Sequence, residues 1–235
     1  MWTLYRCVLL LSMVAAPLPA QFIYKVALGA GVHPKFGINA GEIPQGVKTD
    51  VAFTGVPDIW LQGVLPLDRY GDITARLDIG YMSHAFGIKT GDPDSLNDRT
   101  TFTQHCRYIG IAPSLSLNVL NLGLGIGIPL GATVENKRGD ISRELSSSDV
   151  GTLVEIRLGI SAPLVKDPKG GQLSFQLFAA YGLSGLPVKS YELAREAFVA
   201  RDQPPTESRF APKVASLAVG LSYHFFLGVE RATVE

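Results

Sequence analysis

The chain has 235 residues, of which 46% are hydrophobic and only 18% are charged. Its 21 lysines and arginines equal its 21 aspartates and glutamates, so it lacks the basic excess of a nucleic-acid-binding protein. No apolar stretch reaches the ~18 residues that a membrane-spanning helix needs, which excludes a membrane protein built from helices.

The first twenty residues have the layout of a cleavable secretory signal. Arg6 precedes an apolar run over residues 8–16, and Pro17 ends that run. The run is too short to cross a bilayer as a helix. We therefore expect residues 1–20 to be removed after export and residues 21–235 to fold as one barrel domain.

Apolar residues alternate with polar or small ones along most of the remaining chain, and this period of two predicts β-strands. The clearest stretch alternates from Leu120 to Leu130, with glycine at most of the intervening positions. A bulge near Arg107–Ile109 would explain the weaker alternation of the fourth strand. The eight expected strands cover residues 22–32, 57–66, 73–86, 101–116, 119–134, 150–163, 172–184 and 212–226.

The links between these strands are alternately short and long. Three of them have the composition of tight turns, at residues 68–72, 117–118 and 166–171. The other four are long and polar, at residues 33–56, 87–100, 135–149 and 185–211. In an up-and-down barrel this places every short turn at one rim, as bacterial outer-membrane barrels do on their periplasmic side. Both termini are then expected on the periplasmic side.

A soluble barrel of the lipocalin type shares this period but would expose its polar face to water. Here that face consists mainly of Gly, Ser, Thr and Ala with isolated charges, which fits a narrow interior. The expected strands are also long enough for a tilted membrane crossing of about nine to eleven residues. The sequence therefore predicts an all-β fold, an eight-stranded antiparallel up-and-down transmembrane β-barrel.

The last strand, residues 217–226 (LAVGLSYHFF), completes a pattern that resembles small outer-membrane β-barrel proteins of the OmpA/OmpX-like class. The resemblance covers residues 21–226. It implies a monomer in a Gram-negative outer membrane, in contact with lipid and lipopolysaccharide and inserted by the barrel-assembly machinery. In that class an aromatic residue ending the last strand is an assembly signal, a role that falls to Phe225 or Phe226. The tail 227–235 departs from the pattern of the class.

The inward face of the expected barrel carries several ionisable side chains. Because an unpaired buried charge is costly, we expect them to form a polar network that fills the narrow lumen. The same residues could instead line a narrow path for small or hydrophobic solutes. The set comprises Lys25, Arg76, Asp78, His105, Arg107, Glu155, Arg157 and His224.

No catalytic residue, metal site or cofactor is expected. His84 and His105 could approach across neighbouring strands, as a lipid A-modifying enzyme would require, but no nucleophile or orienting acid is evident. Adjacent strand residues face opposite ways, so Ser83 cannot pair with His84. Cys7 leaves with the signal, and Cys106 alone can form neither an intramolecular disulfide nor a cysteine-pair zinc site.

Two further patterns have ordinary interpretations. The glycines of the fifth strand lack the helix and the Lys-Ser/Thr of a phosphate-binding loop, so we interpret them as small lumen-facing residues. The aspartates of the link 87–100 lack the bidentate glutamate of a calcium loop. The segment 189–201 has the composition of a short amphipathic helix or of a mobile loop.

We expect a non-enzymatic barrel that acts in surface interaction or envelope integrity through its long loops.

Overall fold

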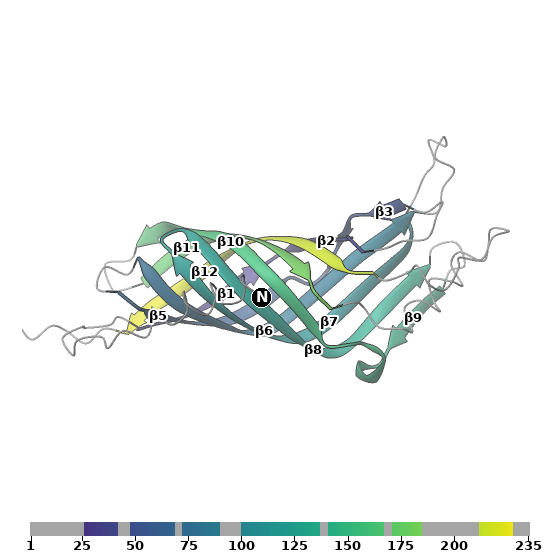
Figure 1. Ribbon diagram of the computed structural model, residues 1–235, viewed down its shortest axis with the longest axis horizontal. Helices are drawn as coiled ribbons and strands as arrows, with labels where there is room; N and C mark the ends of the chain where they lie inside the picture. Colours follow the sequence, from purple (N-terminus) through teal and green to yellow (C-terminus); the bar gives the residue numbers. More distant parts are fainter. Residues whose placement is uncertain are drawn as a thin grey trace, which may run out of the picture.

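The fold is built almost entirely from β-strands (Figure 1). The computed structural model describes residues 26–41, 48–68, 72–89, 100–136, 141–166, 171–184 and 212–227. One short 3-10 helix, Ser147–Asp149, interrupts the strands. The strands are β1 (Val26–His33), β2 (Lys35–Asn39), β3 (Lys48–Asp50), β4 (Ala52–Phe53), β5 (Asp58–Pro66), β6 (Ile73–Lys89), β7 (Thr100–Leu117), β8 (Leu120–Asn136), β9 (Ile141–Leu145), β10 (Leu153–Lys166), β11 (Gly171–Gly182) and β12 (Val214–Leu227).

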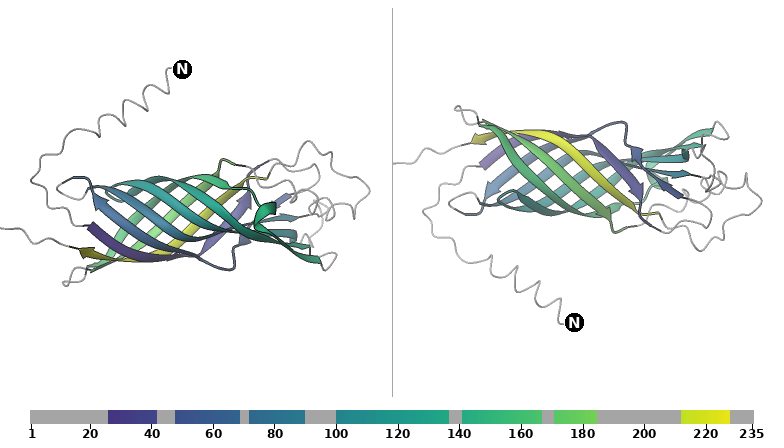
Figure 2. Two further views of the ribbon diagram at one scale, coloured as in Figure 1. Left: turned by 90° about the horizontal axis from the view of Figure 1, so that it is seen from below. Right: turned by 90° about the horizontal axis from the view of Figure 1, so that it is seen from above.

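Eight of these strands form a closed antiparallel ring, as Figure 2 shows from two sides. The hydrogen-bonded order is β1, β5, β6, β7, β8, β10, β11 and β12, and β12 pairs with β1 to close it. The closing pairs run from Val26 opposite Leu227 to Val32 opposite Leu221. A closed ring leaves its strands without free edges. The predicted eight-stranded up-and-down barrel is confirmed.

The expectation that residues 33–56 form a polar loop is wrong, because this link contains β2, β3 and β4. Pro34 separates β1 from β2, because a proline cannot donate to a strand ladder. β2 then pairs with β12, while β3 pairs with β6 and β4 pairs with β2. These pieces are five, three and two residues long, too short for their alternation to be recognised in the sequence.

The link 135–149 is also more ordered than expected. β8 continues to Asn136, and β9 folds back on it with Ala132 opposite Leu145. The 3-10 helix follows, and at its start the side chain of Asp149 accepts hydrogen bonds from the backbone N–H and the hydroxyl of Ser146. This hairpin lies at the end of the barrel where the long links are.

The short turns gather at the opposite rim, together with the ends of β1 and β12 (Figure 2). Leu117 pairs with Leu120, which leaves a two-residue turn in which Asn118 has a φ of 55°. Asparagine tolerates this left-handed conformation better than most residues. The backbone N–H of Asn118 donates to the carbonyl oxygen of Asp72, which ties two neighbouring turns together. The predicted segregation of short and long links is confirmed.

The outer face of the ring is apolar and the inner face is not. Leu61, Leu122 and Phe225 are 70%, 61% and 60% exposed. All six apolar residues that alternate along β8 from Leu120 to Leu130 are exposed as well. A soluble protein rarely leaves a continuous apolar surface of this size uncovered, whereas a barrel in hydrocarbon requires one. Among the described residues, no helix has the length and hydropathy needed to span a bilayer.

Glycines on the inner face make room for larger side chains from neighbouring strands. A Cβ atom on Gly125 would lie 2.7 Å from Cγ of Glu155, and one on Gly127 would lie 2.9 Å from the ring of Tyr108. The interpretation of this glycine series as small lumen-facing residues is confirmed for both positions.

Candidate functional site

Polar side chains fill the middle of the lumen. Five of the eight predicted network residues point inward and are at most 7% exposed, namely Arg76, Asp78, Glu155, Arg157 and His224. Lys25 lies outside the described residues. The remaining two, His105 and Arg107, do not belong to the network.

The prediction that His105 and Arg107 face inward is wrong. Cys106 and Tyr108 take the inward positions of β7 and are 2% and 0% exposed. The Arg107 side chain is instead 38% exposed, and its Nη2 lies 3.8 Å from Oε1 of Glu144 on β9.

The cause is the position of the bulge. The ladder does shift next to Arg107, as expected, but Arg107 pairs with Gly131 and Tyr108 with Pro129. The extra residue is therefore Leu130 on β8, next to Gly131 with its φ of 142°. β7 keeps an unbroken alternation, whereas β8 changes the face that it turns inward.

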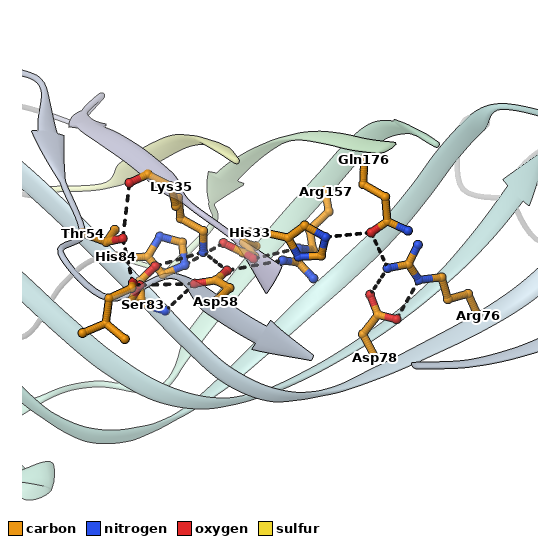
Figure 3. A network of polar contacts seen from close by, with 12 residues as sticks. His33, Lys35, Thr54, Asp58, Arg76, Asp78, Ser83, His84, Arg157 and Gln176 are labelled. Carbon is orange, nitrogen blue, oxygen red and sulfur yellow. Dashed lines mark hydrogen bonds and ion pairs between the residues drawn. The ribbon is translucent and has the colours of Figure 1, made fainter. Parts of the chain in front are cut away.

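A buried ion pair replaces strand pairing where β5 leaves β6. The last β5–β6 pair is Ile59 with Tyr81, so the β6 backbone at Ser83 has no β5 partner. Nζ of Lys35 lies 2.5 Å from Oδ2 of Asp58 and donates to the Ser83 carbonyl oxygen at 2.9 Å. Oδ1 of Asp58 accepts the Ser83 backbone N–H at 2.8 Å. The two side chains thus satisfy both backbone groups of Ser83 (Figure 3).

Glu155 and Arg157 extend this cluster from β10. Oε2 of Glu155 lies 3.1 Å from Nε2 of His84, and Oε1 lies 3.2 Å from Nε of Arg157. Nη2 of Arg157 lies 3.9 Å from Oδ2 of Asp58, on a strand that is not a neighbour of β10. The guanidinium also stacks over Trp60, 4.7 Å from the ring centroid. Arg157 therefore bridges the lumen.

A second cluster is centred on Arg76. Its Nε and Nη2 bind both carboxylate oxygens of Asp78, at 2.6 and 2.8 Å. Nη2 also donates to Oε1 of Gln176, which lies 2.8 Å from Nε2 of His33. This cluster lies at the opposite end of the network from Lys35 (Figure 3).

Phe178 joins the two clusters. Its ring centroid lies 5.5 Å from Cζ of Arg76 and 5.7 Å from Cζ of Arg157, and His33 meets it edge-on at 5.6 Å. The aromatic ring thus lies within cation–π distance of both guanidinium groups.

The charges of the network balance. Three cations, Lys35, Arg76 and Arg157, face three anions, Asp58, Asp78 and Glu155. All six are at most 7% exposed. Buried charges are tolerated better when each has an opposite partner, and here each of the six lies within 4 Å of one. We call these six residues the plug.

Sequence reasoning missed Lys35, Asp58, His33 and Gln176. Lys35 and Asp58 fall within or beside the link that was expected to be a loop, although His33 and Lys35 continue the inward positions of β1. Extending that alternation across Pro34 would have found Lys35.

The approach of His84 and His105 that an enzyme would require is not found. His84 pairs with Cys106 and faces inward, whereas Ala85 pairs with His105. The Ser83 hydroxyl donates to the carbonyl oxygen of Val56 and lies 3.2 Å from Asp58. In the described ranges, no group of three or more His, Cys, Asp or Glu side chains is arranged to hold a metal ion.

The end of β12 carries the two aromatic residues that the resemblance singled out. Phe225 points outward, is 60% exposed and packs edge-on against Tyr223 at 4.7 Å. Phe226 lines the lumen at the short-turn rim. Their role in assembly stays a prediction. The expected signal segment, the link 87–100 apart from its ends, the segment 189–201 and the tail after Leu227 lie outside the described residues.

A closed antiparallel ring with an apolar exterior and a charge-balanced interior defines the class of this protein as a transmembrane β-barrel of the outer-membrane type. No family model matches the chain, and no curated protein matches it.

Among solved structures, the chain is similar to the outer membrane protein OprG from Pseudomonas aeruginosa, with 10% identity and a TM-score of 0.37 over 87% of this chain and 97% of that one. It is similar to Ail, the attachment invasion locus protein of Yersinia pestis, with 13% identity and a TM-score of 0.33 over 86% and 97%. It is also similar to Neisserial surface protein A, with 8% identity and a TM-score of 0.29 over 85% and 95%.

Proposed function

We propose that this protein is a non-enzymatic barrel of the bacterial outer membrane that displays a rigid protein surface outside the cell. The observation that carries the proposal is the combination of an apolar outer belt with an interior that holds six buried, paired charges. The belt fits a hydrocarbon environment. The plug occupies an eight-stranded interior that is just wide enough for side chains, which favours display over conduction.

The displayed surface is an extension of the barrel wall at the long-link end (Figure 1). β6, β7 and β8 continue past the last β5–β6 pair, and β9 adds to β8. Buried apolar residues support this region, with Met82, Tyr108, Ala132 and Leu153 among them. Such packing makes the extension a stable platform for contact with another surface.

β9 lies at one edge of this extension. In the part of the chain that the structure describes, β9 pairs with β8 and with no other strand. Its residues Ser142 and Glu144 are exposed. An unpaired strand edge with polar side chains can bind an extended segment of another protein through backbone hydrogen bonds.

The orientation is tested by cysteine labelling in cells. A membrane-impermeant maleimide is expected to label Ser148→Cys in intact cells, and Asp72→Cys only after the outer membrane is permeabilised. Both positions are exposed, at opposite ends of the barrel, and Cys106 is only 2% exposed, so the unmodified protein supplies the background. Labelling of Asp72→Cys in intact cells would contradict periplasmic short turns and termini.

The surface role is tested by removing the outer part of the β8–β9 hairpin. Ala132 lies opposite Leu145, so an Asn-Gly turn can replace residues 133–144. The β8–β10 pairs that close the ring involve residues 120–127 of β8 and are left intact. Cells that carry the full-length barrel are expected to attach to immobilised extracellular protein, and cells with the shortened hairpin to lose attachment. Equal attachment, or none with either form, would refute a surface role for this edge.

A further inference from the structure

The lumen contains a cavity between the plug and the short-turn rim, lined by both polar and apolar residues. Its volume is about 410 Å³, and Asp72, Asn118 and Val119 of the turns lie at its mouth. We call it the vestibule. The polar residues that line it deeper inside are Arg76, Ser116, Asn121, Gln172, Ser174 and His224.

A cationic side chain, Arg76, lies at the inner end of the vestibule. Arg76 lines the cavity, whereas its ion-pair partner Asp78 does not. The acidic residue that does line it, Asp72, is solvent-exposed at the mouth, where water and salt screen its charge. A group that enters from the short-turn side therefore meets Arg76, whose carboxylate partner Asp78 does not line the cavity.

His224 adds an unused hydrogen-bonding atom beside this charge. The residue is 7% exposed, and its Nε2 has no hydrogen-bond partner among the described residues. The ring is held between neighbouring strands, opposite Gln172 on β11 and Gly29 on β1. A Cβ atom on Gly29 would lie 2.6 Å from Cδ2 of His224, so the ring occupies the space that the glycine leaves. A buried polar atom without a partner is costly, and a ligand that accepts its hydrogen bond removes that cost.

We propose that the vestibule is a binding site for a small phosphate-bearing anion that enters from the short-turn side. Arg76 supplies the cation, Nε2 of His224 a donor, and the side-chain amide of Gln172 and the hydroxyl of Ser174 further hydrogen bonds. Guanidinium groups suit phosphate oxygens because of their planar fork of donors. The volume lies at the lower end of the range for ligand pockets, which favours inorganic phosphate or a compact phosphate monoester over a nucleotide.

Apolar side chains near the mouth extend the range of ligands. Val119, Pro163 and Phe226 line the same cavity. They would accommodate a short apolar portion attached to the phosphate, as in a lipid headgroup with its first carbon atoms. Inorganic phosphate and a lipid headgroup have the phosphate group in common. Ligand binding here would be a function separate from surface display, and the ligand would not have to pass the plug.

The experiment is a titration of the purified barrel in nanodiscs of zwitterionic lipid, followed by the imidazole NMR signals. The chain has four histidines, and His224→Gln identifies the signal of interest. Inorganic phosphate is expected to shift that signal saturably, and sodium chloride at equal ionic strength is not. Loss of a hydrogen bond to a charged ligand typically weakens binding about tenfold or more, so we expect that loss of phosphate affinity in His224→Gln, measured by calorimetry because this variant lacks the signal.

Gln172→Ala, at a half-buried vestibule position, is the second variant, in case His224→Gln does not fold. It is expected to weaken phosphate binding, whereas Ser142→Ala on β9 leaves binding unchanged. A parallel titration with dihexanoyl phosphatidate separates the sources. A response to both ligands supports a free phosphate group, and a response to phosphatidate alone supports a lipid headgroup. A response to neither, or equal phosphate affinity in Gln172→Ala and the unmodified barrel, would overturn the proposal.

Discussion

Replacement of Asp58 with asparagine is expected to lower the free energy of unfolding by about 3–5 kcal/mol, the usual cost of leaving one partner of a buried ion pair alone. Lys35 loses its anionic partner at 2.5 Å, and both side chains are at most 1% exposed. Arg157 loses the same carboxylate at 3.9 Å. The measurement is urea unfolding in lipid vesicles, followed by the fluorescence of Trp60, which stacks with Arg157 inside the plug.

The matched control is Asp50→Asn. Asp50 also pairs with a lysine, Lys89 at 3.2 Å, but these side chains are 19% and 32% exposed. Pairs that contact solvent contribute at most about 1 kcal/mol, so a small change is expected. A double replacement, Lys35→Met with Asp58→Leu, is expected to recover only the part of the loss that comes from the unpaired lysine, because the backbone N–H and carbonyl of Ser83 still lose their partners. Equal destabilisation by Asp50→Asn and Asp58→Asn would show that burial of the pair does not matter.

The second large effect concerns the outer surface. Leu124→Arg is expected to destabilise the inserted barrel by about 2–4 kcal/mol, the cost of an arginine on the lipid face near the middle of the bilayer. Leu124 lies halfway along the apolar series of β8 and is 49% exposed. In water, an exposed leucine could be replaced by arginine with little change, so the size of the loss reports on the surrounding solvent. Reversible unfolding from lipid vesicles measures it.

Leu120→Arg serves as the control, since Leu120 is 54% exposed but lies at the short-turn rim. Near the interface the same substitution costs about 0–1 kcal/mol. The two leucines differ little in exposure, and therefore a difference between the variants reflects depth in the membrane. The absence of any difference would argue against a bilayer around β8.

The architecture was predictable because the alternation of apolar residues with polar or small ones recurs in strand after strand. The alternation in β8 and β12 runs through more than ten residues each, and a strand of that length has one inward and one outward face. The alternation of link lengths gave the topology independently. Both features are local in the sequence, so no knowledge of three-dimensional contacts was needed.

The candidate site was only partly predictable, for two physical reasons. A bulge inserts its extra residue into one strand of a pair, and the sequence near Arg107 does not say which. The only sign in the sequence that β8 carries the extra residue was the glycine at position 131, which has a positive φ in the structure. Lys35 was missed because Pro34 interrupts the alternation that begins in β1. Asp58 was missed because its partner is the backbone of Ser83, 25 residues away, and such a contact leaves no periodic pattern.

The most direct test of the account is the conductance of the purified barrel in a planar bilayer. If the plug closes the lumen as proposed, the unmodified protein is expected to insert without stepwise current. A variant in which Arg76, Asp78, Glu155 and Arg157 are all replaced by alanine removes two cations and two anions, and it is expected to show discrete openings. Stable openings of the unmodified protein, of the same size as those of the variant, would contradict a sealed lumen.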